Sequence, residues 1–208
     1  MPKCKNCKIP FQRQYPMQSH CSIHCAIEDV KNNPKIVKKV ERDSFNSWKK
    51  EVKEKHKTHG DYESLLQDNI NLIVRLIDYG HPCISHDGMC KKENAGHYHA
   101  IGGNNSIRFH LFNNWKQCEH CNSYQSSNRS GYDKGLKALF GFDFWLYVNE
   151  GIVRDYPYIK LSIPELKEKI AIARQIIKEL ESDKQVYSVQ ERIDLRRRYN
   201  ERIGVYTK

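Results

Sequence analysis

The sequence has no long apolar run. Its longest, residues 70–77, is far shorter than the roughly 20 residues that a membrane-spanning helix needs. The chain also lacks an apolar stretch before its first cysteine, Cys4, so we expect no signal peptide. Only 38% of its 208 residues are hydrophobic, which suffices for one or two small domains rather than one large core. These absences predict a soluble, cytoplasmic protein with no membrane partner.

Acidic residues are in deficit. The chain has 25 Asp and Glu against 35 Lys and Arg, a net charge of +10, which favours a polyanionic partner without separating DNA from RNA. Residues 35–57 carry nine basic against four acidic side chains. This segment is either a helix laid along phosphates, with Lys49 and Lys50 as contacts, or a solvated linker helix.

Cysteine, by contrast, is plentiful. Eight cysteines allow four disulfides, but a cytosolic chain is kept reduced, and close cysteine pairs favour metal. The spacing predicts two structural Zn²⁺ sites of four thiolates each. Their ligands would be Cys4, Cys7, Cys21 and Cys25 in the first site, and Cys83, Cys90, Cys118 and Cys121 in the second.

The first quartet predicts a zinc ribbon or knuckle at residues 1–30. So short a segment cannot bury enough apolar surface to fold alone, and the metal must supply the folding free energy. Its role is either contact with nucleic acid or that of a small structural cap, and the sequence favours neither.

Helical patterns flank the central region. Residues 31–79 predict a basic linker helix and then an amphipathic helix that starts near Asp61 and ends at Gly80. Residues 146–208 predict a helical hairpin, because capping boxes start at Ser162 and at Ser188. The second of these helices carries Arg196 and Arg197 on a basic face, either for phosphate contact or simply solvated.

The central region, residues 80–145, contains Gly96-His97-Tyr98-His99 between the zinc cysteines, and Asn122 directly after the last of them. Two histidines two residues apart on a strand point the same way. The order AGHYHAIG, IRF, NNWKQC, EHCN and SSN resembles the phage NinG/Rap recombination endonuclease family, which is HNH-like. The resemblance is good over about residues 76–141 and looser over the N-terminal cysteines.

That resemblance implies a role for each matching position. His97 would be the general base, and His99 and Asn122 would sit beside or bind a catalytic Mg²⁺ or Mn²⁺. Asn113 would tie down the loop and orient the base. Asn128 would be a further ligand candidate, and Arg108 a phosphate clamp. We add Lys116 to the predicted DNA contacts.

One position departs from the usual HNH pattern. Those nucleases commonly carry Asp before the base histidine as a hard oxygen ligand, whereas this chain has Gly96. NinG-like sequences also show Gly there. Asp87, Glu93 and Asn94 are candidate replacements, and His99 favours manganese or another transition ion.

The expected fold is therefore α+β: a small zinc-stabilised ββα-metal (HNH-like) core, an N-terminal zinc knuckle, flanking helices and a C-terminal helical hairpin. The leading functional hypothesis is a metal-dependent endonuclease acting on branched DNA recombination intermediates. We expect a homodimer, which suits symmetric junctions, and a recombination protein as a further partner. The alternatives are a non-specific or nicking HNH nuclease and a non-catalytic zinc-stabilised DNA-binding or adaptor protein.

Overall fold

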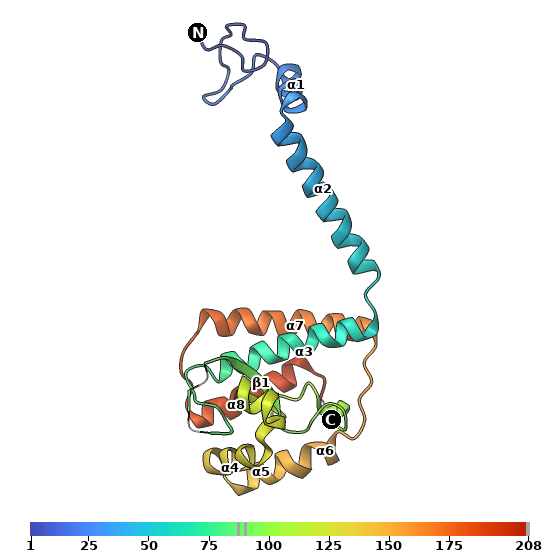
Figure 1. The fold of residues 1–208 in the computed structure, drawn as a ribbon, viewed down its shortest axis with the longest axis vertical. Coiled ribbons are helices and arrows are strands. Elements are labelled where there is room, and N and C mark those ends of the chain that lie inside the picture. Colours follow the sequence, from blue (N-terminus) through green and yellow to red (C-terminus); the bar gives the residue numbers. More distant parts are fainter. Residues whose placement is uncertain (87, 90, 207–208) are drawn as a thin grey trace. The chain divides into compact units, whose positions relative to one another are not determined.

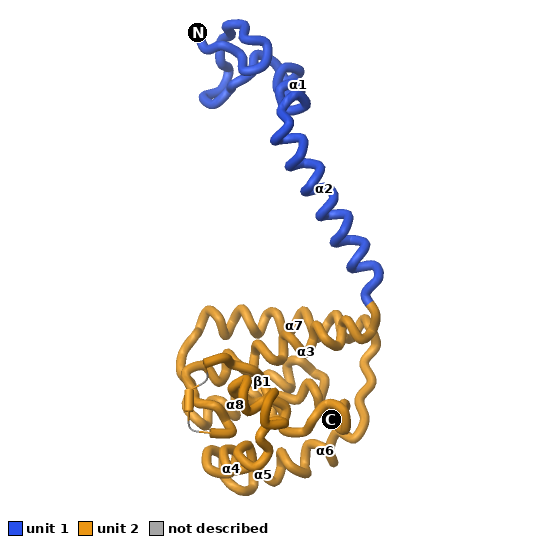
Figure 2. The backbone as a smooth tube through the Cα atoms, viewed as in Figure 1, with its two compact units in different colours: residues 1–57 blue, residues 58–208 orange. Residues whose placement is uncertain are grey.

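The computed structural model describes residues 1–86, 88–89 and 91–206. The chain divides into two compact units, Met1–Lys57 and Thr58–Lys208 (Figure 2). The segment expected at 31–79 therefore contributes to both units, because the boundary falls between its two helices.

The first unit consists of an irregular cysteine-bearing segment and two helices. Lys3 pairs with Pro10 in an isolated bridge. Helix α1 (Ile23–Asn32) starts at the side-chain cap of Ser22, and α2 (Pro34–Lys55) starts at Asn33 with proline at its first turn. Neither helix contains a buried residue, so the basic side chains of α2 are open to solvent.

The second unit is helix-rich around a small sheet. Its elements are α3 (His59–Ile77), β1 (Glu93–His97), η1 (Asn105–Ile107), β2 (Asn114–Cys118), η2 (His120–Tyr124), η3 (Ser126–Asn128), α4 (Arg129–Phe140), α5 (Phe142–Leu146), η4 (Tyr147–Gly151), α6 (Ile152–Asp155), α7 (Ile163–Ser182) and α8 (Val189–Ile203). The two strands are antiparallel, with His97 opposite Asn114 and Glu93 opposite Cys118. Across the described residues, no helix combines the length and apolar character needed to cross a membrane.

Capping explains where the long helices begin. Capping boxes at Ser162 and Ser188 start α7 and α8, as predicted, and Gly204 ends α8 in the left-handed conformation. Helix α3 begins slightly before the expected start near Asp61. Thr58 is the N-cap, and Asp61 closes the box by accepting from the Thr58 backbone N–H. The C-terminal helices do follow one another, but α7 packs mainly along α3 rather than α8 (Figure 1).

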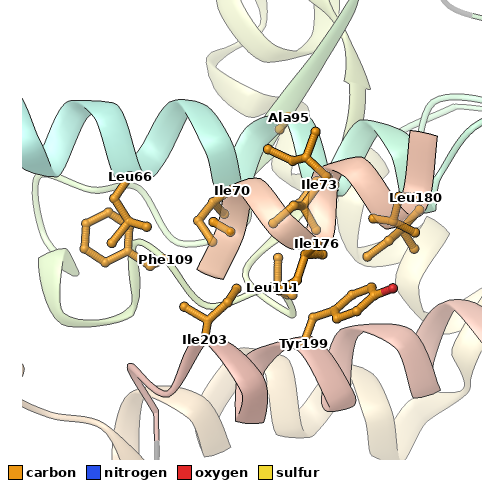
Figure 3. Packing of buried hydrophobic residues seen from close by; sticks show 14 of the residues in the cluster. Leu66, Ile70, Ile73, Ala95, Phe109, Leu111, Ile176, Leu180, Tyr199 and Ile203 are labelled. Carbon is orange, nitrogen blue, oxygen red and sulfur yellow. The ribbon is translucent and has the colours of Figure 1, made fainter. Parts of the chain in front are cut away.

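The larger core lies between α3, α7 and α8 (Figure 3). Leu66, Ile70 and Ile73 of α3 face Ile176 of α7, and Ile203 of α8 lies on the opposite side of the same cluster. Burial of each such side chain contributes roughly 1.5–3 kcal/mol. Helix α3 is therefore the central support of the unit.

The sheet lies between this core and a second, aromatic one. Ala95 of β1 belongs to the first cluster, whereas Trp115 of β2 belongs to the second, together with Tyr132 and Leu136 of α4. Because successive strand residues face opposite sides, a hairpin of two five-residue strands can contact both cores. The hairpin is thus fixed on both faces.

One buried carboxylate ties three elements together. Asp78, just after α3, accepts from the Lys116 backbone N–H at 2.9 Å and from Arg192 and Arg196 of α8 at 2.8 and 2.7 Å. The two guanidinium groups hold the pKa of Asp78 down at about 2 despite complete burial. Arg196 also stacks on Trp115 at 3.7 Å. Arg196 is fully buried, so its predicted place on an exposed basic face is wrong.

Candidate functional site

The first cysteine quartet is brought together as predicted. The sulfur atoms of Cys4, Cys7, Cys21 and Cys25 all lie within 4.8 Å of one another. The short loop from Lys3 to Pro10 presents the first pair, and the start of α1 presents the second. Four soft donors at this separation suit tetrahedral zinc, so the cluster could hold a structural ion.

The second cluster contains a ligand that the cysteine spacing did not reveal. Cys83, Cys118 and Cys121 converge with His86, their donor atoms again lying within 4.8 Å of one another. The predicted ligand Cys90 lies outside the described residues. Three thiolates and one imidazole form a zinc-competent donor set, so this cluster too could hold zinc. It connects the segment before β1 to the end of β2.

Hydrogen bonds prepare this cluster for metal. Burial alone would raise the pKa of Cys118, but the Cys121 backbone N–H and His86 lower it to about 7. Asn128 donates its Nδ2 to the Cys121 sulfur at 3.5 Å, while its Oδ1 caps α4 by accepting from the Gly131 N–H. The oxygen proposed from the sequence as a further ligand is therefore occupied as a helix cap, and Asn128 acts next to the zinc cluster instead.

His97, the predicted base, ends β1 with one ring nitrogen fixed. Its Nε2 lies 3.0 Å from the backbone oxygen of Arg108. A carbonyl only accepts, so Nε2 carries the proton and Nδ1 keeps the lone pair. Burial lowers the pKa of His97, which favours the neutral imidazole. Tyr206 holds the carbonyl-bearing loop by accepting from the Phe109 N–H and donating to the Ser106 oxygen, both at 3.0 Å.

His99 is fixed in the same manner by a different segment. Its Nε2 donates to the Val148 oxygen at 2.9 Å, which leaves Nδ1 as the nitrogen with a lone pair, and burial lowers its pKa. Buried Asn113 accepts from the His99 N–H at 2.8 Å and donates to the oxygens of His99 and Ile107. This is the loop-tethering role that the family resemblance implied for Asn113.

Asn122 lies beside the residue before the base. Its Oδ1 is 3.0 Å from the point where a Cβ on Gly96 would stand. Gln117 of β2 reaches the same space, with its Oε1 at 1.8 Å from that point. The Gln117 side chain is fully buried, and this oxygen has no hydrogen-bond partner among the described residues. A Cβ at position 96 would collide with the buried Gln117 side chain, so a larger residue there requires that side chain to move.

The predicted DNA-contacting cations separate into two groups. Lys116 is buried and pairs with Glu93 at 2.8 Å, so in this fold it is not available to a phosphate. Arg108 is largely covered and faces Glu63 at 3.6 Å. Lys49 and Lys50 on α2 are exposed, and so is Arg197 on α8, which pairs with Asp194. Among these predicted contacts, the accessible positive charge therefore lies on α2 and on the outer side of α8.

Three residues were candidates to replace the aspartate that HNH nucleases carry at the position of Gly96, and not all of them are free to bind a metal. Glu93 is held by Lys116, Asn94 is half-buried two residues before Gly96, and Asp87 lies outside the described residues. Sequence reasoning missed Gln117, although it lies within NNWKQC, one of the segments on which the family resemblance rests. Only the fold shows that one side chain fills the space left by the other.

A comparison with protein-family models finds a match over most of the chain. The family model described as Bacteriophage Lambda NinG protein matches residues 1–184. No curated protein and no solved structure matches the chain significantly. The matched range includes both cysteine clusters, the hairpin and the histidines, and it ends before α8. The chain therefore belongs to the bacteriophage lambda NinG family.

Proposed function

We propose that this protein is a divalent-metal-dependent DNA endonuclease of phage recombination, with His97 as the general base. The observation that carries the proposal is the fixed tautomer of His97, whose Nε2 is bound to the Arg108 oxygen. Its Nδ1 is left with a lone pair at the end of a strand that the zinc-competent cluster anchors. In the described fold, that atom is prepared to accept a proton from water.

The residues around His97 supply rigidity. Asn113 binds the backbone N–H and oxygen of His99 and the oxygen of Ile107, and Tyr132 donates to the Gly96 oxygen at 2.9 Å. Rigid placement of a base contributes to catalysis because the reacting groups need no further ordering. The antiparallel hairpin followed by helical turns and α4 supports the assignment to the ββα-metal class.

The donor set fits a hard or borderline divalent ion. Asn122 Oδ1 would hold it, and His99 Nδ1 is the second candidate donor; amide oxygen suits Mg²⁺ and Mn²⁺, while imidazole favours Mn²⁺. Such an ion would neutralise charge that develops on the phosphate during hydrolysis. The chain's own contribution is to fix His97 and to present the Asn122 oxygen beside Gly96, the residue before it.

DNA as the substrate is supported by the net charge of +10 and by the exposed lysines of α2. We propose the preference for branched DNA on the basis of family membership, because NinG-like proteins are expected to act on recombination intermediates. A homodimer would match the two equivalent strands of a symmetric junction.

The test compares cleavage of a labelled four-way junction with that of a linear duplex carrying the same sequences. Zinc-loaded protein is assayed with Mg²⁺, with Mn²⁺, and without added divalent ion. His97→Ala should reduce the cleavage rate by about 10²–10⁴-fold with unchanged DNA affinity, since only proton transfer is lost. The matched control is His120→Ala, an exposed histidine of the same region outside both cysteine clusters.

Each other outcome rejects part of the proposal. Equal cutting of duplex and junction would leave a nuclease without branch preference. Cleavage by His97→Ala at the wild-type rate would remove His97 as the base. DNA binding without cleavage under either ion would favour a non-catalytic DNA-binding protein.

A further inference from the structure

We propose that Gln117 provides the oxygen ligand that the glycine at position 96 cannot, so that the amide oxygens of Gln117 and Asn122 together bind the divalent cation. This inference rests on the proposed function, and it identifies a metal-binding residue that neither the sequence motif nor the family match assigns.

The orientation of that amide is fixed by its nitrogen. Nε2 of Gln117 donates to the backbone oxygen of Ser127 at 2.7 Å and to Ser85 Oγ at 2.5 Å. A carbonyl cannot donate, so exchanging the amide oxygen and nitrogen would place two acceptors against each other. Ser127 is itself held with a positive φ of 69°. Oε1 must therefore point into the space above Gly96.

That oxygen has no protein partner there. Gln117 is fully buried, and the absence of a partner for a buried amide oxygen costs about 1–3 kcal/mol. Another oxygen faces the same space: Asn122 Oδ1 lies 3.0 Å from the Cβ point of Gly96. In the described residues, the Asn122 side chain has no hydrogen bond either. Two acceptors facing one space require a donor or a cation between them.

The position of Oε1 also accounts for Gly96. At 1.8 Å from the absent Cβ, it occupies the volume that a side chain at position 96 would enter. An aspartate at this position, as HNH nucleases commonly have, would direct its carboxylate into the same volume. Strand β2 thus supplies the oxygen that β1 lacks. It comes from Gln117, two residues after Trp115, which is the residue paired with Gly96. Neutral amide oxygens are hard donors but carry no charge, so binding should be weaker than at a carboxylate site.

The experiment measures Mn²⁺ binding to zinc-saturated full-length protein by calorimetry, without DNA. Gln117→Ala should weaken Mn²⁺ binding by about tenfold or more, given that changes in the surroundings of a metal alone cost 10–100-fold. Gln125→Ala is the matched control, because it removes a glutamine side chain that is exposed and lies close in sequence to Asn122. It should stay within about twofold of wild type.

The double variant Gly96→Asp with Gln117→Ala tests the exchange directly. Removing the glutamine frees the space, and the new carboxylate should restore or exceed wild-type Mn²⁺ affinity. Gly96→Asp alone should fold poorly, because its Cβ collides with Oε1. Should Gln117→Ala also fold poorly, Mn²⁺ broadening of NMR signals from wild type locates the ion: the Gly96 amide and the Gln117 side-chain amide should disappear first.

The inference is overturned if Gln117→Ala binds Mn²⁺ as wild type does, or if broadening centres elsewhere. Either result would mean that the Gln117 oxygen does not bind the cation. The proposed function fails separately: a protein that binds Mn²⁺ through Gln117 but cuts no DNA keeps this inference and loses the nuclease. If the protein cuts DNA but Gln117→Ala binds Mn²⁺ as wild type does, the proposed nuclease function stands and this inference is lost.

Discussion

Replacing Asp78 with asparagine should destabilise the second unit strongly. The substitution keeps the shape but removes the anion that compensates Arg192 and Arg196, both buried. The fall of the Asp78 pKa from 3.8 to about 2 corresponds to roughly 2 kcal/mol of favourable interaction with the carboxylate. Leaving buried charges unpaired costs more, about 3–5 kcal/mol. We expect the larger figure, because the asparagine leaves two guanidinium groups without an anion.

The assay is urea unfolding of zinc-loaded protein followed by tryptophan fluorescence. A Trp48→Phe background is needed, because Trp48 lies in the first unit and would report on that unit. Asp68→Asn is the matched control: Asp68 is exposed on the same helix, α3, and its replacement should change stability by less than about 0.5 kcal/mol. The reasoning is refuted if both variants unfold at the same urea concentration.

The difference in stability between wild type and Asp78→Asn should also depend on pH. A carboxyl group whose pKa is lowered by folding contributes its stability above the unfolded pKa, and loses it as the pH falls through the folded pKa. The difference should therefore be constant above about pH 4 and shrink towards pH 2, the window between 3.8 and about 2. Both proteins carry the same cysteine clusters, so acid release of zinc cancels in the comparison.

Two further predictions concern the zinc cluster and the DNA surface. Asn128→Ala should lower zinc affinity by about 10–100-fold in a chelator competition, because it removes the hydrogen bond to the Cys121 sulfur. It should also lower stability by about 1 kcal/mol, because it removes the cap of α4. An unchanged zinc affinity would contradict this prediction. Lys49→Gln with Lys50→Gln should weaken DNA binding and reduce its salt dependence, whereas Lys116→Met should leave the salt dependence unchanged in an anisotropy titration, since Lys116 is buried.

Local sequence signals predicted much of this fold. The capping boxes at Ser162 and Ser188 start helices because the side chains and backbone groups involved are three residues apart. The first cysteine quartet came together for a similar reason, since two short spacings place two thiolates on each of two turns. Where both partners lie close in sequence, residue types and spacing were enough.

What the sequence could not predict depends on partners far along the chain. Arg196 was assigned to a basic surface because no residue close to it in sequence indicates that it pairs with Asp78, 118 residues earlier. His86 was missed because the spacing rule considered cysteines. Gln117 gains its significance only from Gly96 on the facing strand. Each case requires the tertiary fold.

The anchoring of the Arg108 loop by Tyr206 and α8 has a consequence for synthesis on the ribosome. Leu111 is held from α8 by Asn200, just as Phe109 is held by Tyr206, so this loop is fixed by residues translated about 90 positions later. A nascent chain that has emerged only as far as α7 has its histidines but not the support that positions the Arg108 carbonyl. Completion of the site therefore waits for translation past residue 206, and an unfinished chain would not carry an ordered site.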